Sequence, residues 1–318
     1  MSLPPPAPAP VTEKTFTNFT PSQGANYAQN RGGYHPTLYK TILSHHTSTG
    51  GQLTALLDIG CGPGTVARAL APHFQHVVGL DPSDGMIQNA RSLGGTSGSG
   101  DKIRYEISSA EELGSHLEPR IEEGSVDLIT AATAAHWFNM PHFWQRAACV
   151  LKPGGTVALW TVGSAKTHPS TPNAAAIQTA TEALNDCELQ PYYEPGNRLA
   201  LDLYVDLPLP WTVTPPIAEF DEESYFRKEW GPEHGTGELL ESSGMEMNLE
   251  AIEKIWGTMS QVQRWRDAHP EKARTEEDIV KRMVRVIASL LHEAGVEKGK
   301  EMVKVSLRGV LMMVKKRA

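Results

Sequence analysis

The sequence predicts an α/β fold in which helices cover a doubly wound, mainly parallel sheet. Between residues 53 and 162, short apolar runs of strand length alternate with stretches of helical periodicity. Such alternation is typical of right-handed strand–helix–strand crossovers. A glycine-rich turn follows the first of these apolar runs, as in folds that bind a ligand at the edge of the sheet. Beyond residue 162 the alternation stops, and proline-rich irregular sequence with scattered aromatic residues replaces it.

The length of the chain allows a core with an insertion. With 318 residues, the chain holds two domains of about 150 residues or one enlarged α/β unit. Its composition, 40% apolar and 21% charged, is enough to bury a sizeable core. We expect four parts: a disordered Pro/Ala-rich tail over 1–15, a catalytic core over 16–165, a cap or substrate lobe over 166–270 with a candidate core strand near 220–230, and a C-terminal helix and strand or strands over 271–318 that complete the core sheet.

The individual elements follow from periodicity. The expected strands are Ala55–Gly60, Val77–Asp81, Ile103–Ser108, Val126–Ala131 and Thr156–Val162. The expected helices are Thr37–His46, Thr65–Phe74, Asp84–Leu93, Ala110–Leu117 and His142–Val150. The stretch Gly94–Gly100 carries almost nothing that can be buried, so we expect a flexible loop. Near the end of the chain, Glu276–Ala294 has one apolar face and predicts a helix, and Met302–Val314 predicts a final strand or pair of strands.

Composition also limits the compartment and the partners. No apolar stretch approaches the roughly 18 residues that cross a bilayer, and no cationic start precedes an apolar run, so we expect neither a membrane protein nor a secreted one. The three cysteines favour a reducing, cytoplasmic location. The net charge of -8 disfavours a nucleic-acid partner, because Lys and Arg supply most of the affinity for phosphates. We expect no metal site, since no ligand spacing stands out.

The chemistry centres on the run LLDIGCGPGT over residues 56–65. Glycines let the backbone turn sharply and a ligand approach closely, and the free amides at the start of the next helix favour an anionic group. A carboxylate or phosphate is therefore expected there. Dinucleotide-binding enzymes use a similar strand–turn–helix with the spacing G-x-G-x-x-G. Here the spacing is G-x-G-x-G, with Thr65 where that pattern has its third glycine, which favours another cofactor over a nicotinamide.

Asp58 before this turn, and the Cys-Gly-Pro-Gly inside it, resemble the first motif of class I S-adenosylmethionine (SAM) methyltransferases. Other features of that family follow in order: Asp81 after the second strand, Ser109-Ala110-Glu111 after the third, VDLIT at 126–130 and LKPGG at 151–155. Over Phe16–Val162 the chain also resembles the branch that contains trans-aconitate methyltransferases and fungal cantharidin-resistance methyltransferases, through His136-Trp137-Phe138, Tyr27 and Arg31. A weaker similarity continues at 195–198 and 256–265.

The resemblance implies the seven-stranded class I methyltransferase fold with an inserted cap, and SAM as cofactor with S-adenosylhomocysteine as product. It implies that Asp81 accepts hydrogen bonds from the ribose and that Met86 covers the adenine, with Glu111 or its neighbour Glu112 at the adenine edge. Arg31 would pair with the SAM carboxylate. The residues expected at the cofactor are Tyr27, Arg31, Asp58, Gly60, Cys61, Gly62, Asp81, Pro82, Met86, Ala110, Glu111 and Ala132.

His136 and Trp137 are the expected catalytic residues, because they follow the carboxyl end of a central strand, where open α/β sheets bind ligands. Trp137 would form a wall of the methyl-transfer chamber, and His136 would orient the acceptor or accept its proton. Both could instead belong to a buried aromatic cluster. Candidate substrate contacts are Arg198, Trp256, Met259 and Arg264, the arginines as clamps for an anion and the apolar side chains as pocket walls or cap core. Arg227 and Arg266 are further candidate clamps.

The resemblance implies methyl transfer to an oxygen of a small molecule, and we expect a carboxylate acceptor, such as a trans-aconitate-like polycarboxylate. A carboxylate is already an anion at neutral pH and needs no general base, so positioning would supply most of the catalysis. Two alternatives stay open: a natural-product O-, N- or S-methyltransferase of secondary metabolism, and a non-catalytic SAM-binding protein. We expect a monomer or a homodimer.

Overall fold

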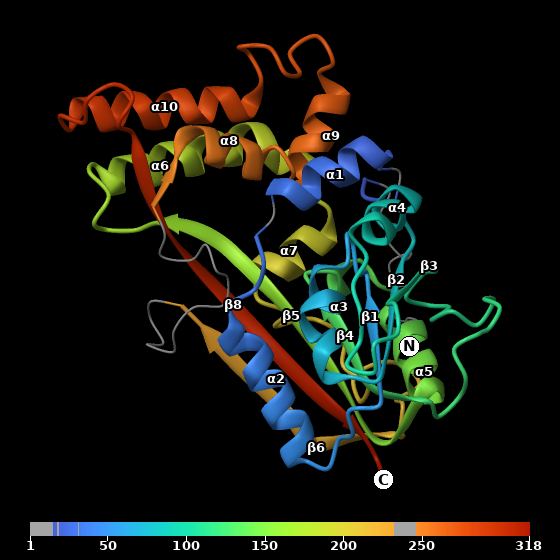
Figure 1. The fold of residues 1–318 in the computed structure, drawn as a ribbon. Helices are drawn as coiled ribbons and strands as arrows, with labels where there is room; N and C mark the ends of the chain where they lie inside the picture. The colour runs from blue at the N-terminus through green and yellow to red at the C-terminus, as the bar shows by residue number, and fades with distance from the viewer. Residues whose placement is uncertain (1–14, 18, 31, 232–245) are drawn as a thin grey trace, which may run out of the picture.

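The computed structural model in Figure 1 describes residues 15–17, 19–30, 32–231 and 246–318. The tail expected over 1–15 lies outside these residues except for Thr15, and so does the expected cofactor residue Arg31. No helix within the described ranges is both long enough and apolar enough to cross a membrane.

One twisted sheet forms the centre of the molecule, with the strand order β3-β2-β1-β4-β5-β8-β6 and a short β7 paired to β8. The strands are β1 (Ala55–Ile59), β2 (His76–Asp81), β3 (Arg104–Ile107), β4 (Val126–Ala132), β5 (Leu151–Thr167), β6 (Phe220–Trp230), β7 (Glu246–Asn248) and β8 (Met302–Lys316). Strands β1 to β5 pair in parallel, whereas β8 runs antiparallel to both β5 and β6. The predicted doubly wound, seven-stranded sheet is confirmed, with β7 as a short addition.

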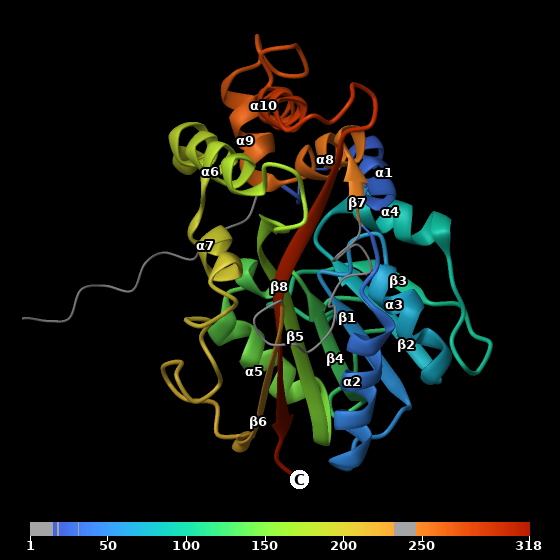
Figure 2. The same cartoon turned by 90° about the vertical axis from the view of Figure 1, so that its left-hand side faces the viewer.

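Helices cover both faces of the sheet. They are α1 (Pro21–Asn30), α2 (Pro36–Ser48), α3 (Thr65–Leu70), α4 (Asp84–Leu93), α5 (Met140–Val150), α6 (Ala174–Leu184), α7 (Pro195–Leu201), α8 (Leu249–Trp256), α9 (Ser260–Ala268) and α10 (Ile279–Glu293). Successive strand residues face opposite sides, so Leu57 of β1 packs with the α5 cluster and Leu56 with the cluster of α2, α3 and α4. Figure 2 shows α5 on one side of the strands and α2 and α3 on the other.

We call the elements α6 to α10 the cap. In Figures 1 and 2, α6, α8, α9 and α10 gather with α1 beyond one end of the sheet. Ile287 of α10 packs with Ile177 of α6 and Ile252 of α8, so this helix, which we expected in the C-terminal part that completes the core sheet, packs with the cap. Val303 and Val305 of β8 join the same cluster. The last strand therefore runs from the cap into the sheet as one continuous element, and not as a pair.

Two local predictions differ from the structure. The helix expected over Ala110–Leu117 is wrong: the segment forms turns, with Leu113 and Gly114 at φ values of 45° and 72°. A regular right-handed helix excludes such left-handed residues, and here the burial of Leu113 outweighs the helical pattern. The stretch Gly94–Gly100 is a loop, but backbone bonds fix it to the body, since Gly98 N donates to Phe74 O at 2.7 Å and Ser97 is buried.

A buried ion pair joins the beginnings of three parallel strands. Asp127 of β4 accepts hydrogen bonds from the backbone amides of Thr54 and Ala55, at 3.0 and 2.7 Å, where β1 begins. Lys152 of β5 donates to the same carboxylate at 2.8 Å. The Asp127 side chain is only 3% exposed, whereas the Lys152 side chain is 31% exposed and still reaches solvent.

We predict that Asp127→Ala lowers the free energy of unfolding by about 1–3 kcal/mol, because it leaves two backbone amides without their acceptor and Lys152 without its ion pair. Urea denaturation measures the loss. Glu122→Ala is the matched control: its pair with Arg120 is exposed at 62–63%, and its removal should cost at most about 1 kcal/mol. Equal losses of unfolding free energy in the two variants would show that Asp127 does not hold the three strands together.

Candidate functional site

The glycine turn after β1 lies at the carboxyl edge of the sheet and leaves one open face. Gly60, Gly62 and Gly64 all have left-handed backbones, with φ values of 59°, 52° and 81°. A Cβ atom on Gly60 would lie 2.6 Å from the Ala134 Cβ, and one on Gly64 would lie 2.5 Å from the Tyr105 hydroxyl. A Cβ on Gly62 would meet no atom within 4 Å. Gly60 and Gly64 are thus required by packing, whereas Gly62 borders space that a ligand can approach.

Asp58 holds this turn from inside the protein. Its carboxylate is 1% exposed and accepts hydrogen bonds from Thr130 Oγ1 at 2.7 Å and from the Ala67 amide at 3.2 Å. It therefore connects β1 with β4 and with the first turn of α3. Burial raises the pKa of Asp58 to about 7, against the opposing effect of these two hydrogen bonds.

Asp81 ends β2 and holds the turn from the other side. Its Oδ2 accepts a hydrogen bond from the Gly62 amide at 2.9 Å, and its Oδ1 accepts one from the Ser83 amide at 2.9 Å. Cys61 lies between the two acids and is buried, which raises the pKa of its thiol well above the usual range. Cys61 is thus a packing residue and not a nucleophile. The structure brings Asp58, Gly60, Cys61, Gly62 and Asp81 together around one turn.

The residues expected at the adenine edge lie in the neighbouring turns. The Ser108 amide donates to the Asp81 carbonyl at 3.2 Å, which places the turn after β3 beside Asp81. In this turn Ala110 is buried, and Glu111 Oε1 accepts the Asn139 amide at 2.8 Å where α5 begins. Glu111 therefore connects the turn after β3 with the turn that leads into α5. The three remaining positions are a half-buried Ala132 at the end of β4, an exposed Pro82 and a buried Met86 in α4.

His136 and Trp137 form a short 3-10 turn after β4. The His136 Nδ1 lies 2.9 Å from the Tyr204 hydroxyl, a contact between the core and the segment after α7. Burial lowers the pKa of His136 to about 3 and raises the pKa of Tyr204, so both groups are neutral near pH 7. Gly196 of α7 packs directly on this turn: a Cβ there would lie 2.6 Å from Trp137 Cε3 and 2.7 Å from the His136 carbonyl.

Backbone strain surrounds this turn. Thr133, which comes just before it, has φ 51°, and the consecutive Leu203 and Tyr204 have φ 53° and 60°. A left-handed backbone is a genuine outlier for a β-branched residue, and such strain gathers at functional sites. The Thr133 hydroxyl lies 2.8 Å from the Tyr34 hydroxyl, and the Thr133 amide donates to Trp160 O at 2.7 Å. Sequence reasoning missed Thr133 and Tyr34, because no glycine marks the strained position.

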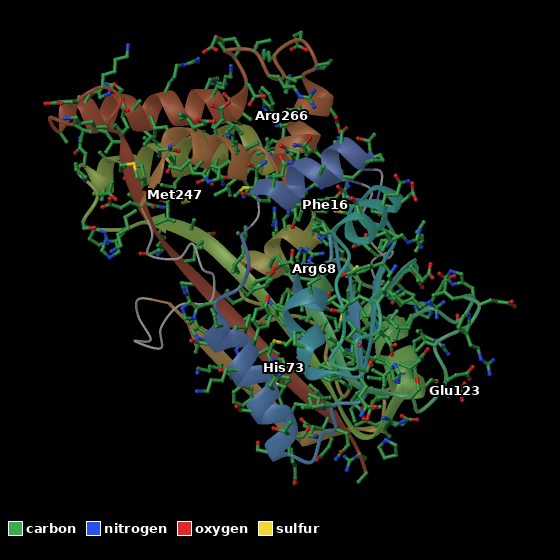
Figure 3. The ribbon with its side chains drawn as sticks, viewed as in Figure 1. Phe16, Arg68, His73, Glu123, Met247 and Arg266 are labelled. Atoms are coloured by element: carbon green, nitrogen blue, oxygen red, sulfur yellow. The ribbon has the colours of Figure 1, made fainter. Side chains whose placement is uncertain are left out.

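Aromatic rings cover the site from the N-terminal side. The Phe16 ring lies 6.5 Å from the Trp137 ring and 5.9 Å from that of Tyr27, both edge to face. Tyr27 also lines a pocket of about 260 Å³ between α1 and the beginning of α9, whose wall includes Arg266 and Arg274. Figure 3 shows Phe16 near α1 and Arg266 in the cap above it. Apart from its aromatic residue type, nothing in the sequence indicated that Phe16 belongs to the site.

The expected substrate residues are mostly engaged within the cap. Arg264 donates from Nε to the Tyr192 carbonyl at 2.8 Å and pairs with Glu194 at 3.3 Å. Trp256 and Met259 pack against the cap's own apolar clusters. The other two candidate clamps are also paired, Arg227 with Glu229 and Arg266 with Asp278. Arg198 is exposed on α7.

Comparisons with known proteins match the part of the chain that holds this site. A family model described as "Methyltransferase domain" matches residues 57–159, which include the glycine turn and the His136-Trp137 turn. A Dictyostelium discoideum protein named "Putative methyltransferase" is 32% identical over 202 residues, which cover 63% of this chain and 69% of that protein. A Saccharomyces cerevisiae protein named "Probable S-adenosylmethionine-dependent methyltransferase" is 32% identical over 151 residues, 48% of each chain. The match thus spans about half the length of the yeast relative.

A solved structure shares the fold. The chain superposes on a protein from Anaeromyxobacter dehalogenans, titled "Putative Type II Methyltransferase", with a TM-score of 0.56 and 21% identity. The match covers 90% of this chain and 97% of that one, so it includes the cap as well as the sheet.

The pKa of Asp58 predicts a pH dependence of stability. An unfolded chain releases this proton near the ordinary value of 3.8, whereas the folded protein keeps it to about pH 7. Between these values the unfolded state binds fewer protons, so stability falls as the pH rises, by about 1.4 kcal/mol per pH unit. Relative to Asp58→Asn, the ligand-free wild type should lose about 3 kcal/mol between pH 4.5 and 7.

Urea denaturation at several pH values measures this difference. Asp84→Asn, a change at an exposed carboxylate in the first turn of α4, should give a curve parallel to that of the wild type. If the curve of Asp58→Asn also ran parallel to the wild type, Asp58 would not carry the raised pKa.

Proposed function

The chain belongs to the class I SAM-dependent methyltransferases, and we propose that it binds SAM at the glycine turn and transfers its methyl group to a carboxylate oxygen of a small molecule. SAM supplies a methyl group that its sulfonium makes reactive. The observation that carries the carboxylate acceptor is the neutral His136, which is a poor base at neutral pH. An acceptor that is already anionic needs no base.

The residues at the glycine turn fit SAM. Gly62 offers an open face beside a buried carboxylate, and no Cβ narrows that approach. A carboxylate can accept about four hydrogen bonds. Asp81 can therefore hold the Gly62 amide and bind a ribose hydroxyl at the same time. We assign the adenine side to Met86, Ala110 and Glu111, and Tyr27 to the cover above the cofactor.

The chain's own groups would act on the acceptor by positioning it. Trp137, fixed by Gly196 and Phe16, provides a rigid wall, and His136, held by Tyr204, presents a neutral ring. Neutral groups orient an anion without a proton transfer. Holding two reactants in the right geometry can replace much of what acid–base catalysis would supply.

The pocket between α1 and α9 is lined by Tyr27 but not by His136 or Trp137, so it can attract a compact anionic acceptor without being the place of methyl transfer. At about 260 Å³ it is smaller than most ligand pockets, which begin at about 300 Å³. Arg274 lines it, and none of the described carboxylates pairs with the guanidinium of this exposed residue. We propose that Arg274 attracts the acceptor, together with Arg198 on the exposed face of α7, whereas Arg264 is engaged with protein partners.

A second candidate acceptor is an apolar natural product. Phe16, Tyr27 and Trp137 give the cover an aromatic surface, which suits a phenol, amine or thiol on a ring system. Such an acceptor has to lose a proton, and general-base catalysis would then have to come from a group other than a histidine whose pKa is about 3.

Release of S-adenosylhomocysteine from SAM distinguishes the candidates. The purified protein is incubated with trans-aconitate and related polycarboxylates, and in parallel with panels of phenols, amines and thiols. Turnover on the carboxylates supports the proposal. Turnover only on the other panels assigns the natural-product acceptor, and SAM binding without any turnover assigns a non-catalytic role.

We predict that Asp81→Asn weakens SAM binding about 10- to 150-fold, because a charge-assisted hydrogen bond worth about 1.5–3 kcal/mol is lost. Isothermal titration calorimetry measures the Kd. Asp84→Asn changes a carboxylate three residues away on the exposed side of α4 and should leave the Kd unchanged. Equal affinities for the wild type and Asp81→Asn would remove Asp81 from the cofactor site.

With a carboxylate acceptor, we predict that kcat stays flat between pH 6 and 9, because His136 remains neutral over this range. His136→Asn should lower kcat up to about 100-fold through lost positioning and leave the profile flat. Steady-state rates at saturating SAM provide the test. A basic limb in the wild type that disappears in His136→Asn would instead make His136 a general base.

A further inference from the structure

Arg264 of α9 lies where separate segments of the chain meet. Its guanidinium is 17% exposed and binds the segment before α1, the turn before α7, α7 itself and its own helix. The partners and distances are Tyr192 O at 2.8 Å from Nε, Thr15 Oγ1 at 3.0 Å and Glu194 at 3.3 Å from Nη1, and Asn197 Oδ1 at 2.6 Å and Ser260 Oγ at 3.3 Å from Nη2. All three guanidinium nitrogens therefore donate to acceptors of the protein itself.

One set of these contacts fixes α7. Asn197 Oδ1 accepts from Arg264 and also from the Glu194 amide at 3.0 Å, in the capping box that begins the helix. The neighbouring Gly196 is the residue that packs on Trp137 and on the His136 carbonyl. The position of Arg264 therefore determines how α7 meets the turn at His136.

The contact between Arg264 and Thr15 fixes Phe16, one of the aromatic residues that cover the site. Thr15, which accepts from Arg264 Nη1, is adjacent to Phe16, whose ring lies against Trp137. One guanidinium thus holds two elements that pack on Trp137: α7 through Asn197, and the N-terminal segment through Thr15. Arg suits this role better than Lys, because its planar fork binds several acceptors in fixed directions, whereas an ammonium is a point charge.

We propose that Arg264 is a positioning residue for methyl transfer, which holds α7 and Phe16 against Trp137 and so fixes the walls of the acceptor chamber. The proposal rests on the proposed function in one respect, since it takes Trp137 as a wall of that chamber. None of the contacts described above for Arg264 involves the glycine turn. Its loss should therefore change acceptor kinetics without changing SAM affinity.

The test compares Arg264→Met with Arg282→Met. Arg282 is a half-buried arginine of α10 that also pairs with a glutamate, Glu188 at 2.7 Å. This pair connects α10 with residues 185–189 and does not involve α7 or the N-terminal segment. We expect Arg264→Met to lower kcat/KM for the acceptor about 100-fold. Its SAM Kd should equal that of the wild type, and Arg282→Met should retain wild-type kinetics. Arg264→Lys should recover only a small part of the loss.

Hydrogen exchange gives a readout that needs no acceptor. In Arg264→Met, the amides of residues 15–17 and 195–201 should exchange faster, while those of β1 and β4 stay unchanged. If no acceptor is turned over, the proposed function fails. The exchange data still show whether Arg264 holds residues 15–17 and α7 in place. Unchanged exchange in both segments overturns the proposal, and so does an equal effect of Arg264→Met and Arg282→Met on kcat/KM.

Discussion

Two buried carboxylates hold the glycine turn, and the candidate site depends on them. Three left-handed glycines in five residues give a backbone with many accessible conformations, and ordering it costs more entropy than ordering other residues. Asp81 fixes the Gly62 amide, and Asp58 fixes the first turn of α3 to β4. With both in place, Gly62 presents its open face in one position. A turn ordered in advance binds its ligand without a further loss of entropy.

The second half of the site is built where the core meets the cap. His136 and Trp137 come from the sheet, whereas Tyr204 and Gly196 come from the cap side. The long strands β5 and β8 run from the sheet toward the cap, so the two parts share a continuous framework. The strained backbones at Thr133 and Tyr204 lie at this junction. Burial lowers the pKa of His136 to about 3, and the role that we propose for its neutral ring is therefore to orient an acceptor and not to accept a proton.

Local signals predicted the core, and contacts between distant residues account for most of what they missed. Glycine spacing located the turn, and apolar runs located the parallel strands, because both depend on residues close together in sequence. The helix expected over Ala110–Leu117 failed because tertiary packing of Leu113 overrode a helical pattern. Tyr204 lies 68 residues from its partner His136, and Arg264 binds Thr15 across 249 positions. Sequence periodicity does not reveal contacts between residues so far apart. Arg264 could therefore be predicted as a candidate substrate contact but not as a residue that connects parts of the cap.

The crystal structure of the protein with bound S-adenosylhomocysteine tests the central claim most directly. The account predicts the ribose hydroxyls within about 3 Å of the Asp81 carboxylate, the ligand over the open face of Gly62, and its sulfur directed toward His136 and Trp137. Binding in the pocket between α1 and α9, or anywhere remote from the glycine turn, would contradict it.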